Sequence, residues 1–114
     1  MILPALFLVL LAAPQEAVTS SDVPAANPSA SLADIDAGLA LFKKHHFAQA
    51  EAEFQKAVDA DPSSAAAHFY LGYAIYKIAE PKRPFHPDKQ KAAAQFAKAY
   101  DLDPQFRPVW AGRK

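Results

Sequence analysis

Apolar residues recur every three or four positions along two stretches of the chain, 32–64 and 65–106, which is the period of an amphipathic α-helix. Each stretch is interpreted as a pair of helices. Pro62 and Pro104 are each preceded by Asp and mark helix ends, because the residue before a proline is driven out of the helical region. The pattern predicts an all-α domain of about four helices, followed by a C-terminal partial turn.

Aligning the chain with itself shows that both helices of the first pair recur in the second. At a shift of 34, residues 38–43 match residues 72–77, with Gly, Ala and Lys identical. At a shift of 42, residues 50–62 match residues 92–104 at eight identical positions. The difference of eight residues predicts an insertion at 80–87, where three prolines forbid a continuous helix.

Small and aromatic residues occupy equivalent places in the two copies. Gly38, Gly72, Ala50 and Ala92 are expected to let paired helices approach closely, while Phe54 and Phe96 fill the space between pairs. The inserted segment is basic and aromatic, with Lys82, Arg83, Phe85, Lys89 and Lys91 partly balanced by Glu80 and Asp88. Such a loop suits an acidic partner, and a solvated linker is the alternative.

This arrangement resembles the tetratricopeptide repeat (TPR) family, whose pattern is W-x2-L-G-x2-Y, then A-x3-F, then P. The residues that carry the resemblance in the first unit are Gly38, Ala50, Phe54 and Pro62, with Leu41 in place of the tyrosine. Those in the second unit are Leu71, Gly72, Ala92, Phe96 and Pro104, with His68 in place of the tryptophan and Ile75 in place of the tyrosine. The resemblance implies stacked antiparallel helix pairs forming a short solenoid over 32–106, with repeat one at 32–64 and repeat two at 65–106.

The resemblance also implies a function, because the first helices of this family line a concave groove that binds peptides or proteins. Carried over by register, the partner-binding residues are Leu39, Phe42, Lys43, Phe69, Tyr73, Tyr76 and Lys77. Their apolar and aromatic character favours an apolar or extended protein segment as ligand. Two alternatives stay open: the aromatic stripe is simply core, or the apolar face is used in self-association and the protein is a structural homo-oligomer.

The first residues are interpreted as an export signal. Residues 1–13 form an apolar run without charged side chains that, at about 1.5 Å per residue, is too short to span a bilayer. We expect a signal peptide at 1–20, a flexible linker at 21–31 and a periplasmic or extracellular protein. The alternative is a protein anchored in the membrane through residues 1–13. Membrane contact is expected only if these residues are not cleaved off. Ser31, three residues before Asp34, is predicted to cap the first helix.

Composition excludes several other functions. Lys plus Arg and Asp plus Glu both total 12, so the chain lacks the basic excess expected of a nucleic-acid-binding protein. It has no Cys, and His45 and His46 lie in a predicted turn where neighbouring side chains rarely converge on one metal. Without a recognisable catalytic motif, the sequence predicts no enzyme, no cofactor and no metal.

Stacked repeats bury each other's apolar faces, and about three repeats are usually required for stability. The apolar surface at the end of the second unit is therefore expected to be covered by something else. Trp110 lies six residues after Pro104, where a third unit would place its tryptophan. Residues 107–114 are interpreted as a C-terminal tail. The apolar residues expected at the open end are Phe96, Ala99, Tyr100, Phe106, Val109 and Trp110. We therefore expect a partner or self-association to cover them.

Overall fold

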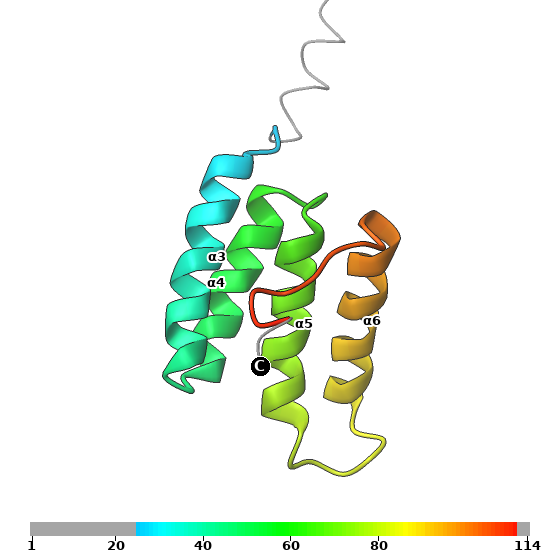
Figure 1. Ribbon diagram of the computed structural model, residues 1–114. Helices are drawn as coiled ribbons and strands as arrows, with labels where there is room; N and C mark the ends of the chain where they lie inside the picture. Colours follow the sequence, from blue (N-terminus) through cyan, green and yellow to red (C-terminus); the bar gives the residue numbers. More distant parts are fainter. Residues whose placement is uncertain (1–24, 112–114) are drawn as a thin grey trace, which may run out of the picture.

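The computed structural model describes residues 25–111, which contain four helices and no strand. The helices are α3 (Pro28–Lys43), α4 (Phe47–Ala60), α5 (Ala65–Ala79) and α6 (Pro87–Leu102). Neighbours along the chain run antiparallel and pack in order, and α3 also touches α5 (Figure 1). The predicted fold of stacked antiparallel helix pairs is therefore confirmed. The predicted signal peptide at 1–20 lies outside the described residues, and no helix within 25–111 is long and apolar enough to cross a membrane.

Helix α3 begins earlier than the sequence analysis predicted. It starts at Pro28, inside the predicted linker, and the side-chain oxygen of Asn27 accepts a hydrogen bond of 3.1 Å from the Ala30 N–H. Asn as cap followed by Pro in the first turn is itself a strong helix start, which competes with the capping signal at Ser31. Ser31 is buried within α3 instead, and its hydroxyl donates to the Ala57 carbonyl at 2.9 Å. The prediction of Ser31 as a cap was wrong.

The ends of α4 and α6 follow the repeat. Each helix ends two residues before its proline, at Ala60 and Leu102. Asp61 accepts from the Ser63 N–H at 3.2 Å, and Asp103 accepts from the Gln105 N–H at 2.9 Å. The recurring aspartates therefore make the same short-range turn bond in both helix pairs.

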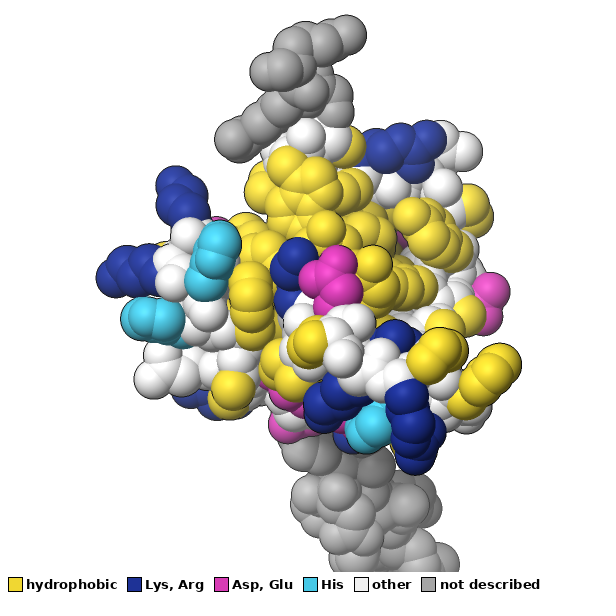
Figure 2. Space-filling view, turned by 90° about the horizontal axis from the view of Figure 1, so that it is seen from below, with side chains coloured by type: hydrophobic (Ala, Val, Ile, Leu, Met, Phe, Trp, Pro, Cys, Tyr) yellow, Lys and Arg dark blue, Asp and Glu magenta, His cyan; other side chains and the backbone are white. Residues whose placement is uncertain are grey.

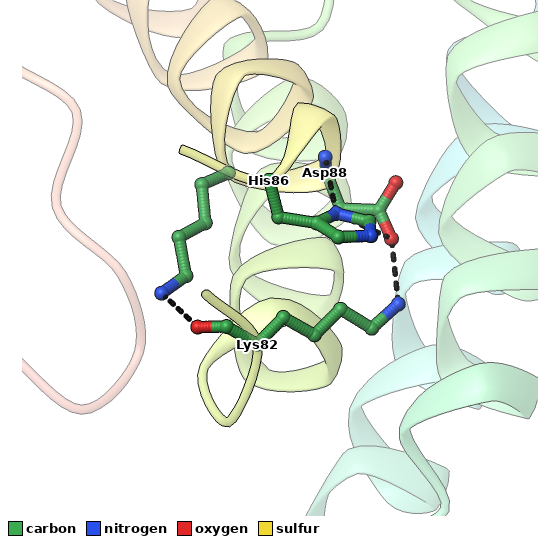
Figure 3. A network of polar contacts seen from close by, with 4 residues as sticks. Lys82, His86 and Asp88 are labelled. Carbon is green, nitrogen blue, oxygen red and sulfur yellow. Dashed lines mark hydrogen bonds and ion pairs between the residues drawn. The ribbon is translucent and has the colours of Figure 1, made fainter. Parts of the chain in front are cut away.

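The connection between α5 and α6 spans residues 80–86, against three residues, 44–46, between α3 and α4. Polar contacts hold the longer connection in place (Figure 3): Lys82 Nζ donates to Asp88 at 2.8 Å, and the Asp88 N–H donates to His86 Nδ1 at 3.1 Å. The hydrogen bond from Lys82 lowers the pKa of Asp88. Pro87, counted with the inserted segment by sequence, is the first residue of α6, a position where proline's missing N–H costs nothing.

The core lies where α3, α4 and α5 meet, around Phe54, which is 1% exposed. The ring of Phe54 sits directly on Gly38, where any side chain would collide with it. His68, expected to be a packing substitute for tryptophan, is also buried, but its Nε2 donates to the Pro62 carbonyl at 2.8 Å and its Nδ1 lies 2.7 Å from Gln95 Oε1. The ring therefore links α5 to α6 by hydrogen bonding as well as by packing.

Candidate binding face

The predicted contact residues come from α3 and α5, which contact each other, and the rings of Phe42 and Tyr73 meet between the two helices. Ring centroids are 5.4 Å apart for Phe42 and Tyr73, 6.2 Å for Tyr73 and Phe69, and 5.8 Å for Tyr73 and Tyr76. Tyr73 therefore stands at the centre of an aromatic cluster that joins the two helices. We call this surface the α3–α5 face.

Accessibility differs across the α3–α5 face. Phe69 is buried, Leu39, Phe42 and Tyr73 are half-buried, and Tyr76 is exposed. Ligands therefore have direct access to the Leu39 and Tyr76 ends of the face rather than to Phe69.

The two predicted lysines of the face are placed differently. Lys77 pairs with Glu80 at 3.1 Å, and its Nζ lies 5.8 Å from the centre of the Phe47 ring. The hydrogen bond to Glu80 raises the pKa of Lys77. Lys43 is exposed and forms no ion pair within residues 25–111. Of the two ammonium groups, the one on Lys43 is therefore open to an anionic ligand.

The C-terminal segment, residues 103–111, folds back across the α3–α5 face instead of continuing the solenoid. It leaves the end of α6 and crosses α5 towards α3 (Figure 1). The Trp110 ring lies 5.0 Å from Tyr73 and 6.1 Å from Phe42, almost parallel to the latter. Phe106 lies 5.3 Å from Phe69, so the segment itself covers the middle of the face.

Two hydrogen bonds join the C-terminal segment to the helices among the described residues. The Asp103 N–H donates to the Ala99 carbonyl at the end of α6, at 2.9 Å, and the Val109 N–H donates to the Tyr70 hydroxyl of α5, also at 2.9 Å. Burial raises the pKa of Tyr70, and this hydrogen bond opposes the shift. The hydroxyl is therefore protonated at neutral pH, with its oxygen available to the segment.

This arrangement corrects the expected open end of the second helix pair. Ala99 is fully buried, and Phe106 and Trp110 pack on the core. Tyr100 and Val109 remain exposed to solvent, with exposed fractions of 45% and 54%. Because the chain turns back on itself, Phe106 and Trp110 lie on the α3–α5 face instead of at the expected open end.

Two pockets flank Trp110 and Phe42 on the α3–α5 face. The first, of about 540 Å³, lies between α3 and the C-terminal segment and is lined by Leu39, Ala40, Phe42, Lys43, Lys44, Val109 and Trp110. The second, of about 480 Å³, is lined by Phe42, Lys43, His45, Phe47, Tyr73, Lys77 and Glu80. Figure 2 shows broad apolar surface on the end of the molecule seen from below, with an acidic side chain beside a basic one near its middle and Lys, Arg and His side chains around the edge.

Sequence reasoning missed three residues of this site. Phe47, the first residue of α4, packs on Phe42 with 4.9 Å between ring centroids. The signal in the sequence that could have pointed to Phe47 was its position directly after the two histidines of the predicted turn. Tyr70 and Trp110 carried no such signal, because their contact joins residues 39–40 positions apart that no local pattern connects.

The histidines do not gather into a metal site within residues 25–111, where no group of three or more His, Cys, Asp or Glu side chains could hold an ion. His45 stacks on Phe47 and adopts a left-handed backbone conformation with φ of 64° in the turn after α3. His86 caps α6. Both rings therefore have local structural contacts.

The family model described as tetratricopeptide repeat matches residues 35–105. The chain belongs to the tetratricopeptide repeat family. It is also similar to Superkiller complex protein 3 of Mus musculus, with 36% identity over 73 residues. That match covers 64% of this chain, and the chain spans only 4% of the length of that relative. No solved structure matches the chain. TPR proteins are generally non-catalytic scaffolds, and TPR domains typically bind protein partners.

Proposed function

We propose that this TPR protein is a non-catalytic binding module with two repeats, 32–64 and 65–106, whose α3–α5 face receives an extended segment of a partner protein. The observation that carries the proposal is the 540 Å³ pocket on that face, lined by Leu39, Phe42 and Lys43. These are three of the residues that family register assigns to partner binding. Apolar walls with a few polar groups at the rim are the usual make-up of a ligand pocket.

One side of the pocket belongs to helix α3, and the other is formed by Val109 and Trp110 of the C-terminal segment. Leu39 and Phe42 project from α3, and Phe42 is held between Phe47 and Tyr73, at 4.9 and 5.4 Å between ring centroids. Aromatic side chains fixed in this way offer contact area at little cost in conformational entropy. A partner segment would therefore meet a preformed surface.

The binding proposal is tested with peptides selected from a random display library against the immobilised chain. We expect Lys43→Gln and Tyr76→Ala to weaken the selected peptides about tenfold, because each removes an exposed contact, and tenfold corresponds to about 1.4 kcal/mol. Isothermal titration gives the affinities, with Lys98→Gln on the exposed side of α6 as the matched control. Peptides that bind all three variants as well as the parent would place the site elsewhere and contradict the proposal.

We further propose that the chain is exported. Support comes from the uncharged apolar run 1–13 and from the small residues that follow it. The intact mass of protein recovered outside the cytoplasm is expected to correspond to a chain that starts between Pro14 and Ser21. Full-length chain recovered in the membrane fraction would show that residues 1–13 act as an anchor instead.

A further inference from the structure

The C-terminal segment occupies the α3–α5 face in the manner of a bound peptide. It is not helical, and it places two aromatic side chains, Phe106 and Trp110, against rings of α3 and α5. A main-chain N–H of the segment, that of Val109, donates to a side chain of the face. Aromatic anchors combined with a main-chain hydrogen bond are features of peptide recognition in a groove.

Its attachment is weak compared with that of the helices. Phe106 and Trp110 are only half-buried, and Val109 between them is 54% exposed. Past the end of α6, where the Asp103 N–H donates to the Ala99 carbonyl, one hydrogen bond joins residues 104–111 to the helices, that from the Val109 N–H to Tyr70. A segment outside the helices whose anchoring side chains are half-buried opens at lower free-energy cost than the packed helices beneath it.

The pocket beside the C-terminal segment is positively charged, and residues 104–111 of the segment offer no negative charge to it. Lys43 and Lys44 both line the pocket next to Trp110, and no acidic residue lines that pocket. Within residues 104–111 the segment carries one charged side chain, that of Arg107, which is exposed. Within residues 25–111 no carboxylate lines this pocket, so charge-assisted hydrogen bonds from Lys43 and Lys44 are available to a ligand.

From these observations we propose that the C-terminal segment is a displaceable internal ligand of the α3–α5 face, and that the external ligand is an extended peptide with a large aromatic residue followed by carboxylates. The inference rests on the proposed function and names its ligand class. A tethered segment competes at an effective concentration of the order of millimolar, so the external peptide needs contacts that the segment lacks. Carboxylates reaching Lys43 and Lys44 provide them.

Trp110 is the only tryptophan of the chain, so its fluorescence reports the position of the segment directly. The probe is a synthetic peptide with the sequence of residues 104–111, carrying Trp110→Phe so that it does not fluoresce, followed by three Glu. Added to the full chain, it is expected to produce a saturable red shift of Trp110 emission as the indole moves into water. The matched control peptide ends in three Lys and is expected to bind at least about tenfold more weakly.

Two variants of the chain complete the test, with binding measured by calorimetry. Lys43→Gln combined with Lys44→Gln is expected to remove the preference for the Glu peptide. Trp110→Ala removes the internal anchor and is expected to bind the Glu peptide about tenfold more tightly than the parent. Should Trp110→Ala fail to fold, the red shift in the parent chain decides the question alone.

The outcomes separate this inference from the proposed function. Lysine-dependent binding of the Glu peptide without any red shift would overturn displacement and leave the binding face in place. A folded Trp110→Ala chain that binds no more tightly than the parent would overturn it too. If the Glu peptide does not bind, the proposed ligand class is overturned. The peptides selected by display then still test whether the α3–α5 face is a binding site.

Discussion

Replacing Gly72 by Leu is expected to destabilise the domain by about 3 kcal/mol or more, at or above the upper end of the usual range for overpacking. A Cβ at this position would lie 2.9 Å from the Cβ of Gln95 and 3.1 Å from the carbonyl oxygen of Ala92. Both atoms belong to α6 and stand on or next to its backbone, so no flexible side-chain end can yield. The helices α5 and α6 would have to separate to admit the new side chain.

Thermal unfolding followed by circular dichroism measures this effect, with a fall of about 4–8 °C in Tm per kcal/mol for a domain of this size. Ala93→Leu is the matched control, because Ala93 is exposed on α6 and its replacement is expected to change stability by no more than about 0.5 kcal/mol. A Gly72→Leu chain that melts like the parent would show that α5 and α6 do not cross closely at this glycine.

Replacing Phe54 by Ala is expected to cost about 3–5 kcal/mol, the range for emptying a buried aromatic position. Phe54 is 1% exposed, its ring fills the space over Gly38, and it lies 5.6 Å from the ring of Tyr70. Its removal therefore leaves a cavity where α3, α4 and α5 meet. A large fraction of the marginal stability of a small domain is lost with it.

Chemical denaturation of the Phe54→Ala chain gives the free energy of unfolding directly, and Phe85→Ala provides a control with the same change in side chain. Phe85 is 83% exposed in the connection between α5 and α6, so its loss is expected to change stability by no more than about 0.5 kcal/mol. Equal effects at the two positions would mean that the core does not lie around Phe54.

The helices and their close contacts could be predicted because local signals fix them. The positions of Gly72, Asp61 and Asp103 predicted a close crossing and helix ends that the structure contains, whereas the space at Gly38 is taken by the ring of Phe54. The start of α3 shows the limit of such signals. Asn27 and Ser31 are both suitable caps, and Ser31 is drawn into the helix because its hydroxyl reaches the Ala57 carbonyl of α4.

The candidate site was predicted only in part. Family register placed Phe42 and Tyr73 on one face, and the structure brings their rings to 5.4 Å. It could not show that Phe69 is covered by Phe106 and Trp110, since the sequence pattern extended the solenoid straight on past Pro104. The family register also does not include Phe47, which joins the site from α4.

By itself the sequence determined the all-α architecture, the helix pairs and the family, because helical period, caps and prolines act within a few residues. Only the tertiary structure decided where the C-terminal segment goes. After Leu102 no local pattern directs residues 103–111, and their path depends on which apolar surface the four helices leave uncovered. That surface exists only once α3 and α5 are side by side, and Trp110 packs against both, 6.1 Å from Phe42 and 5.0 Å from Tyr73.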